Sequence, residues 1–392
     1  MWLLQYWQVT ACTAGCGGPN PTNVITQPNR LLVAWATPAA IKADFYNAWV
    51  YGDLTGTNVP NVSSGLGINA NEWLDYPDLA WSDTYLYVGI DHGFTIPEKV
   101  YSGRRIVARL SLADMANSAA TVVNYGYAEL TGSNGLNKTH FVQGASDRML
   151  VGSLDNSSTL REFTLKDSDS SIPSATLGIT QIQQGSNYTS VAPDGTDWLS
   201  VSFPGNITGA TYHEIPGEQP IQQYLFAFDA GVNGAGRPRS YVRFDTLSPS
   251  GDSYVVSSEY NIWNPDYAFA MAALGSDGID IGISLAVGGG TIGYPQMAVG
   301  YKNDFVVYQV TNSNATQTFT TAGGGTCARF GDYLSARPIP VLAEDGSSLF
   351  SSEVYDVTLP SGSPGGSTCL TVGCTASMRF VEFGRPGNPG PD

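Results

Sequence analysis

Short runs of apolar residues, each introduced by a polar turn, recur along most of the chain. The turns contain Asp, Gly or Asn, and the runs that follow are alternating or continuously apolar. The copies begin at Asn29 (NRLLVAWA), Ser82 (SDTYLYVGI), Ser146 (SDRMLVGSL), Pro193 (PDGTDWLSVSF), Ser250 (SGDSYVVSS), Ser276 (SDGIDIGISL), Lys302 (KNDFVVYQV) and Glu344 (EDGSSLFSSEVY). A period-two pattern bounded by turn residues predicts a β-strand. The chain therefore reads as a long series of short strands.

Several of these strands have a partner close by in the sequence. RRIVARLSL follows the copy at Ser82, STLREFTL follows the copy at Ser146, QQYLFAFD follows the copy at Pro193, and SYVRFDTL precedes the copy at Ser250. Each pair predicts an antiparallel hairpin. Helical periodicity is almost absent, and SLADMANSA from Ser111 predicts only a single Ser-capped turn. The start, MWLLQYWQVT, alternates like a strand and lacks the basic start of a signal peptide, so we expect a leader or an upstream strand to precede it.

A series of short strands is compatible with a sandwich, a β-helix or a propeller. The units recur roughly every 40–60 residues, which favours a propeller, since a β-helix repeats at a much shorter interval. We predict an all-β fold: a β-propeller of about six or seven four-stranded blades. It forms one domain over residues 1–383, with a loop insertion at 10–29 and a flexible Gly/Pro tail at 384–392.

Composition and charge narrow the classes of partner. Charged residues make up 13% of the chain, and 34 acidic against 18 basic residues give a net charge of −16. The electrostatic field of such a negative net charge repels phosphate backbones, so we expect no nucleic-acid partner. No stretch reaches the roughly 18 apolar residues of a membrane helix, so we expect no membrane insertion. The expected partners are glycans or other copies of the chain itself.

The cysteines indicate an oxidising, extracellular setting. Cys12 and Cys16 can close one short loop and Cys369 and Cys374 another, or a bridge can join the two ends of the chain. Cys327 is left over and reads as a buried thiol or an intermolecular bond. Candidate glycosylation sequons begin at Asn61, Asn137, Asn156, Asn187, Asn206 and Asn314. We predict a secreted or cell-surface protein.

SVAPDGTDW, with Ser190, Asp194, Gly195 and Trp198, resembles the Asp-box (BNR-type) repeats of sialidase-like propellers. RFGDYLSARP from Arg329 is similar to a segment of secreted bacterial propeller proteins that are mostly uncharacterised. The resemblance implies that the Asp caps a turn, that the aromatic residue packs between strands, and that the protein is a secreted propeller. Sialidases also carry an Arg-Ile-Pro-like motif near the start. This chain has none, and its nearest match is GRPRS at Gly236, so the resemblance does not extend to sialidase activity.

Few residues can carry acid–base chemistry, because the chain has only 3 histidines. His92 ends a strong strand beside Asp91, a position from which it can act as a proton-transfer group. With Tyr101 and Arg104 it forms a candidate catalytic set for a polysaccharide lyase, which needs a base and a cation for the uronate carboxylate. His140 precedes another strand, and His213 lies in what reads as a polar loop.

Metal and ligand sites complete the set of candidates. Asp75 and Asp78 can supply oxygens to a structural Ca²⁺, although turn aspartates are more often capping residues. Aromatic residues at loops and strand ends can contact sugar rings or protein partners. These candidate ligand-binding residues are Tyr76, Trp81, Trp263, Tyr267 and Tyr333.

Two functional hypotheses follow. The first is an extracellular binding or structural module that contacts glycans, proteins or other copies of itself. The alternative is a carbohydrate-active enzyme, either a polysaccharide lyase or a glycoside hydrolase, with its site at the mouth of the propeller channel. We favour the binding module, because no set of residues in the sequence specifies a catalytic reaction.

Overall fold

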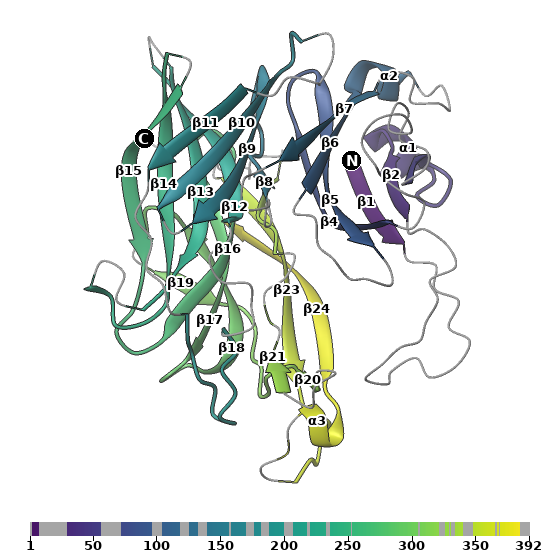
Figure 1. Ribbon diagram of the computed structural model, residues 1–392. Coiled ribbons are helices and arrows are strands. Elements are labelled where there is room, and N and C mark those ends of the chain that lie inside the picture. The colour runs from purple at the N-terminus through teal and green to yellow at the C-terminus, as the bar shows by residue number, and fades with distance from the viewer. Residues whose placement is uncertain are drawn as a thin grey trace, which may run out of the picture. The chain divides into compact units, whose positions relative to one another are not determined.

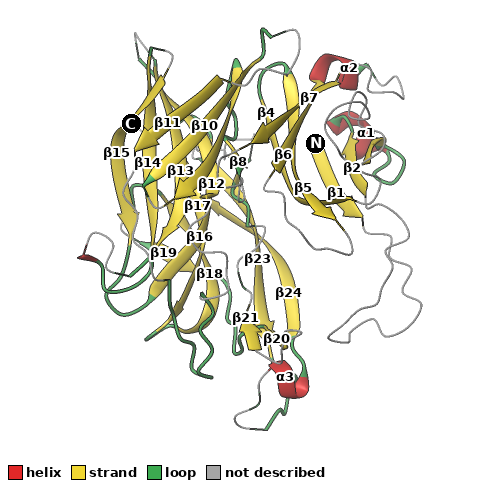
Figure 2. Ribbon diagram, viewed as in Figure 1, coloured by secondary structure: helices red, strands yellow, loops and turns green. Residues whose placement is uncertain are grey.

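The computed structural model of the chain is built almost entirely of β-strands (Figures 1 and 2). It describes residues 2–7, 30–55, 72–95, 104–117, 125–131, 139–156, 158–169, 176–181, 188–199, 207–217, 220–232, 236–251, 253–304, 306–320, 326–328, 330, 334–339, 348–364, 367 and 369–384. The all-β prediction is confirmed. The number of blades stays a prediction.

The chain divides into two compact units. Unit 1 comprises residues 1–141, 145–151 and 162–177, and unit 2 comprises residues 142–144, 152–161 and 178–392. The predicted single domain over residues 1–383 stays a prediction.

Unit 1 holds two antiparallel sheets whose strands follow one another in chain order. The first has the order β1-β2-β3, with β1 (Trp2–Trp7), β2 (Arg30–Trp35) and β3 (Val50–Thr55). The second has the order β4-β5-β6-β7, with β4 (Glu72–Trp81), β5 (Tyr85–Thr95), β6 (Arg104–Ser111) and β7 (Tyr125–Thr131). Two short helices, α1 (Pro38–Ala43) and α2 (Leu112–Ala116), lie between strands.

Four consecutive strands form a further sheet in the order β11-β10-β9-β8. They are β8 (His140–Phe141), β9 (Arg148–Asn156), β10 (Thr159–Lys166) and β11 (Thr176–Gln181). STLREFTL therefore pairs with the strand of the copy at Ser146, as predicted.

Unit 2 holds two complete four-stranded meanders and several further elements. The first meander consists of β12 (Ile207–Ile215), β13 (Ile221–Ala230), β14 (Tyr241–Ser250) and β15 (Ser253–Ile262). The second consists of β16 (Ala268–Ser276), β17 (Ile281–Gly289), β18 (Gly293–Tyr301) and β19 (Val307–Gln309). The remaining elements are β20 (Thr318–Thr320), β21 (Thr326–Ala328), β22 (Arg337–Pro338), β23 (Leu349–Thr358), α3 (Cys369–Val372) and β24 (Thr375–Gly384).

Several local predictions are confirmed. RRIVARLSL pairs antiparallel with the copy at Ser82 as β6 and β5, and SYVRFDTL pairs with the copy at Ser250 as β14 and β15. The predicted Ser-capped turn is α2. The N–H of Asp114, in the first turn of α2, donates to Ser111 Oγ at 3.3 Å. The start of the chain is a strand, and β1 pairs with the next strand, β2.

Two local predictions are wrong. QQYLFAFD (β13) pairs with β12 and β14, not with the copy at Pro193, of which residues 193–199 form no strand and residues 200–203 lie outside the described residues. Before that stretch, Asp197 Oδ1 accepts the N–H groups of both Ser190 and Leu199, which stabilises a turn at 190–199. His213 lies within β12 and not in a loop. Gly384 ends β24, and the predicted tail at 384–392 stays a prediction. Residues 10–29 and 385–392 lie outside the described residues.

Turn aspartates act as caps. Asp194 Oδ1 accepts the N–H of Thr196 at 3.0 Å, and Gly195 between them has a φ of +82°. Asp277 Oδ1 accepts the N–H groups of Ile279 and Asp280. Trp198, after the first of these turns, is fully buried. The cap and the buried aromatic have the roles that the Asp-box resemblance implies, while membership of that family stays a prediction.

Each unit has its own apolar core. In unit 1, Trp35 packs with Val88 and Leu110, and its Nε1–H donates to the Met115 carbonyl at 2.8 Å. In unit 2, Phe244 packs with Phe269 and Leu285 between the two meanders. The meanders approach closely because β12 carries Gly209 at the contact, where a Cβ would lie 2.6 Å from the Ala272 carbonyl oxygen. Thr208 Oγ1 strengthens this contact by donating to the same oxygen at 2.9 Å.

Candidate functional site

Several loops of unit 2 converge at one end of its two meanders. Because neighbouring strands run antiparallel, the loops after β13, β15 and β17 leave the sheets at the same end. The segment before β12 joins them: the Thr189 N–H donates to Ser240 Oγ at 3.2 Å, and Ser190 Oγ donates to the Gly288 carbonyl at 3.1 Å. We call residues 188–199, 236–240, 263–267 and 289–294 the loop face.

Arg237 and Trp263 form the most distinctive pair on the loop face. The Arg237 guanidinium carbon lies 4.2 Å from the centre of the Trp263 ring, which is the geometry of a cation–π contact. Trp263 remains 41% exposed. Arg237 Nε is buried and has no hydrogen-bond partner among the described residues. The pair thus presents an aromatic surface beside a cation in a strongly acidic chain.

The loop face is preformed by close backbone contacts. Gly290 has a φ of +51°, and a Cβ there would lie 1.6 Å from the Asp266 carbonyl oxygen, so only glycine lets these two loops meet. Arg239 Nε donates to the Pro265 carbonyl at 3.4 Å. Tyr267, from the same loop as Trp263, packs edge-on to Phe269 at 5.3 Å. These contacts hold the exposed rings in place without a ligand.

Tyrosine hydroxyls near the loop face stay protonated. Burial raises the pKa of Tyr294, and the charge of Asp194 raises it further. Burial is also the main cause that raises the pKa of Tyr188, with smaller contributions from Asp229 and Tyr241. Protonated phenols both donate and accept hydrogen bonds, as sugar hydroxyls require.

A buried ionic cluster lies along one face of β14 and β15. Arg243 Nε donates to Asp245 Oδ1 at 3.0 Å, and Arg243 Nη2 lies 2.9 Å from Glu259 Oε2. Asp245 is fully buried, and its Oδ2 has no hydrogen-bond partner among the described residues. Burial raises the pKa of Asp245 to about 6, and the charge of Glu259 adds to this against the opposing effect of Arg243. Asp245 therefore gains a proton in mildly acidic solution.

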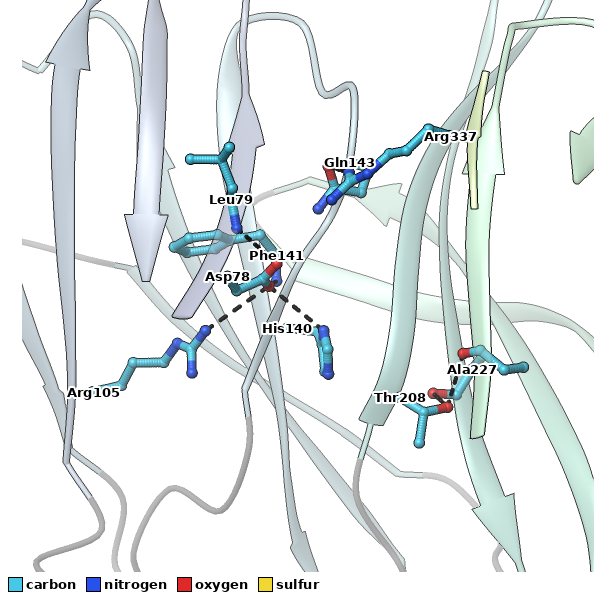
Figure 3. A network of polar contacts seen from close by, with 10 residues as sticks. Asp78, Leu79, Arg105, His140, Phe141, Gln143, Thr208, Ala227 and Arg337 are labelled. Carbon is cyan, nitrogen blue, oxygen red and sulfur yellow. Dashed lines mark hydrogen bonds and ion pairs between the residues drawn. The ribbon is translucent and has the colours of Figure 1, made fainter. Parts of the chain in front are cut away.

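A second polar cluster lies in unit 1 around Asp78 (Figure 3). The Asp78 carboxylate accepts the N–H of Phe141 at 2.7 Å and that of Leu79 at 2.9 Å. His140 Nδ1 lies 3.5 Å from its Oδ2, and Arg105 Nη2 lies 3.9 Å from the same atom. Burial raises the pKa of Asp78, but the His140 hydrogen bond and the charges of His140 and Arg105 outweigh it and lower the pKa to about 2.

Arg105 fits this cluster because Gly89 leaves room for it. A Cβ on Gly89 would lie 2.7 Å from Arg105 Nη2, and the Arg105 guanidinium carbon lies 5.6 Å from the centre of the Phe141 ring. With a pKa of about 2, Asp78 stays ionised at neutral pH and cannot serve as a general acid. The cluster balances the buried Arg105 charge and joins β4 to β8.

The structure describes only the backbone of two of the predicted catalytic residues. His92 on β5 is paired with Arg104 on β6 in the antiparallel register. The side chains of both residues lie outside the described part of the chain, as does the whole of Tyr101. The assignment of His92, Tyr101 and Arg104 as a catalytic set stays a prediction.

The predicted ligand-binding residues separate into different places. Trp263 and Tyr267 come together on the loop face. Trp81 ends β4 half-buried against the Trp35 core of unit 1. Tyr76 lies in β4 with its side chain outside the described residues, and Tyr333 lies outside them altogether.

The proposed calcium ligands also differ in their surroundings. Asp78 is engaged with Arg105 and His140, whereas Asp75 lies opposite Asp91 in the register, with its side chain outside the described residues. Within the described part of the chain, no group of three or more His, Cys, Asp or Glu residues can hold a metal ion. A structural Ca²⁺ stays a prediction.

The cysteine and sequon predictions are tested in part. Cys369 and Cys374 form a disulfide with their Cα atoms 4.9 Å apart, as predicted. Cys12 and Cys16 lie outside the described residues, and Cys327 lies in β21 with its side chain outside them. Asn314 is exposed, and its Oδ1 accepts the Leu359 N–H at 2.9 Å. Asn156 ends β9, and the other sequons (Asn61, Asn137, Asn187 and Asn206) lie outside the described residues.

Sequence reasoning missed the charged residues of β14 and β15. In YVRFDTL, the period-two alternation places Arg243 and Asp245 on the same side of the strand as the buried Tyr241. Two opposite charges on an inward-facing side indicate a buried ion pair, and this pattern could have been found in the sequence. His213 was also misplaced: it is half-buried, and its Nδ1 lies 2.9 Å from Ser276 Oγ. Burial lowers the pKa of His213, and the charge of Lys302 lowers it further.

Among the described helices, none has the length and apolar character needed to cross a membrane. The chain matches no protein-family model and no curated protein. Among solved structures it is similar to the crystal structure of a subtype N11 neuraminidase-like protein of A/flat-faced bat/Peru/033/2010 (H18N11), at 9% sequence identity and a TM-score of 0.29. The similarity covers 81% of this chain and 89% of that chain. A TM-score this low carries no argument for the fold or the function.

Proposed function

We propose that this protein is an extracellular β-propeller whose loop face binds glycans. The observation that carries the proposal is the Arg237–Trp263 pair, which presents a ring that is 41% exposed beside a cation on a preformed surface. Sugar rings bind aromatic faces through their apolar C–H surfaces, and their hydroxyls bind fixed polar groups at the edge.

The topology supports a propeller. Strands β4 to β7, β8 to β11, β12 to β15 and β16 to β19 each form a four-stranded sheet in chain order, and the first, third and fourth of these are antiparallel throughout. Consecutive four-stranded meanders are the repeating unit of that fold. The Cys369–Cys374 disulfide supports an extracellular setting, because such bonds persist in oxidising compartments.

The chemistry of the loop face favours binding over cleavage. Glycoside hydrolysis needs two carboxyl groups facing each other across a bond. On the loop face the carboxylates of Asp194 and Asp197 are engaged by backbone N–H groups of their own turn. Its arginine, aromatic rings and protonated phenols are suited to recognise hydroxyl-rich ligands.

Trp263→Ala is expected to weaken glycan binding by about tenfold, the effect of losing one buried aromatic contact at a binding site. The measurement is a glycan array screened with purified protein, followed by calorimetry on the best ligand. Tyr308→Ala is the matched control, because Tyr308 is a 65% exposed aromatic on β19 outside the loop face. Unchanged affinity in the Trp263 variant, or equal loss in both variants, would refute the proposed site.

A further inference from the structure

The turn between α1 and β3 in unit 1 exposes an unusual number of aromatic side chains. Phe45 is 55% exposed, Tyr46 is 86% exposed and Tyr51 is 53% exposed, and Trp49 lies between them in the sequence FYNAWVY. Single exposed apolar residues are common on protein surfaces, but a contiguous group of large rings marks an interaction site. We call residues 44–51 the aromatic turn.

The aromatic turn is held in one conformation by Asp44. Its Oδ1 accepts the N–H groups of Tyr46 at 3.1 Å and Asn47 at 3.3 Å, and its Oδ2 accepts from Asn47 Nδ2 at 2.8 Å. The Asp44 N–H closes α1 by donating to the Ala40 carbonyl at 2.9 Å. The backbone of the turn therefore needs little ordering when a ligand binds, which removes part of the entropic cost of binding.

The rings do not form a flat strip. Phe45 meets Tyr46 edge-on, with ring centres 5.6 Å apart and planes at 88°, and meets Trp49 at 5.9 Å and 85°. A crystalline polysaccharide surface requires coplanar rings, whereas rings at right angles can contact two sides of a single chain. The geometry thus fits one flexible polymer chain better than a flat surface.

Charge restricts the class of ligand further. The segment from α1 to Tyr51 carries Lys42 as its single cation and Asp44 as its single anion, within a chain of net charge −16. Anionic lipid surfaces and acidic polymers are attracted by clusters of Lys and Arg, which this segment lacks. A neutral ligand rich in hydroxyls matches both the exposed rings and the polar Asn47.

We propose that the aromatic turn is a second glycan-binding site, which takes single chains of neutral polysaccharide. Phe45 and Tyr46 supply the apolar contact with the sugar rings, and Asn47 supplies hydrogen bonds to their hydroxyls. This site lies in unit 1, so it does not depend on the Arg237–Trp263 pair of unit 2.

Native affinity electrophoresis tests this proposal. Purified full-length protein is run through gels that contain hydroxyethylcellulose, galactomannan, xyloglucan or dextran, and its retardation gives an association constant. At least one polymer is expected to retard the protein, and the double variant Phe45→Ala with Tyr46→Ala is expected to bind it about tenfold more weakly. Tyr46→Phe keeps the ring and is expected to retain most of the binding.

Matched variants separate this site from the loop face. Tyr308→Ala removes an equally exposed ring elsewhere and is expected to leave retardation unchanged. Absence of retardation by every polymer, or an association constant of the Phe45 and Tyr46 double variant equal to that of the wild type, overturns the proposal. Retardation lost only in Trp263→Ala also overturns it while leaving the loop-face proposal standing. Co-sedimentation with phosphatidylserine vesicles that depends on Phe45 and Tyr46 overturns it in favour of a lipid surface.

Discussion

Replacing Asp78 with asparagine is expected to lower the free energy of unfolding by about 2–3 kcal/mol at neutral pH. Asp78 accepts two backbone N–H groups and lies beside His140 and Arg105, and Arg105 is fully buried. Asparagine keeps the shape of the side chain but removes the negative charge that balances the buried guanidinium. An uncompensated buried charge is strongly destabilising.

The loss should depend on pH in a specific direction. The pKa of Asp78 is about 2 in the folded protein, below the 3.8 of the free side chain, so its stabilising effect is present above about pH 4. The effect disappears as the pH falls towards 2. Urea unfolding of both proteins between pH 7 and pH 2.5 measures this, and the two curves should converge at the acid end.

Asp147→Asn is the control for this experiment. Asp147 also pairs with an arginine, at 2.7 Å from Arg148, but its side chain is 60% exposed. Exposed ion pairs contribute about 0–1 kcal/mol, so this variant should unfold almost as the wild type does. An Asp78→Asn protein as stable as the Asp147→Asn protein would contradict the account of the Asp78 cluster.

Replacing Asp245 with asparagine is expected to have the opposite effect and to raise the free energy of unfolding by about 3 kcal/mol at neutral pH. The pKa of Asp245 is raised to about 6 by burial, so the folded protein holds a proton there that the unfolded chain releases. The contribution of this proton to the free energy of unfolding is complete below about pH 4 and is lost as the pH rises through 6. Asparagine removes that penalty and can still accept the Arg243 hydrogen bond.

Urea unfolding between pH 4 and pH 8 measures the effect of Asp245→Asn. The wild type should lose stability across this range through Asp245, and the variant should lose less. Asp266→Asn, an exposed carboxylate of the same unit, should follow the wild type at every pH. A variant less stable than the wild type at pH 7 would show that the Asp245 charge is needed by Arg243, contrary to the expectation.

The two aspartates show why a neighbouring arginine does not by itself fix a pKa. Asp78 receives backbone N–H groups and a histidine in addition to Arg105, and together they outweigh its burial. Asp245 receives one Arg243 bond, while one of its oxygens is buried without a partner among the described residues, and Arg243 is shared with Glu259. Burial therefore dominates at Asp245 and the hydrogen-bonding groups dominate at Asp78.

Local sequence was enough to predict the all-β class, the hairpins of β5–β6 and β14–β15, the Ser111 cap and the Cys369–Cys374 bridge. Each of these depends on residues close together in the chain, where period-two alternation, turn residues and short spacings act directly. The partner of QQYLFAFD shows the limit of the same reasoning, since β13 pairs with β12 and β14 and not with the copy at Pro193.

The candidate sites were decided by the tertiary structure. Trp263 and Tyr267 could be chosen from the sequence as aromatics at strand ends, but Arg237 stacks on Trp263 only because the β13–β14 and β15–β16 loops meet. Asp78 and His140 are far apart in the sequence and become neighbours only when β8 lies beside β4. The alternating pattern of a strand indicates which side of the sheet each residue faces. The partner on that side belongs to another strand, whose position depends on the packing of the whole unit.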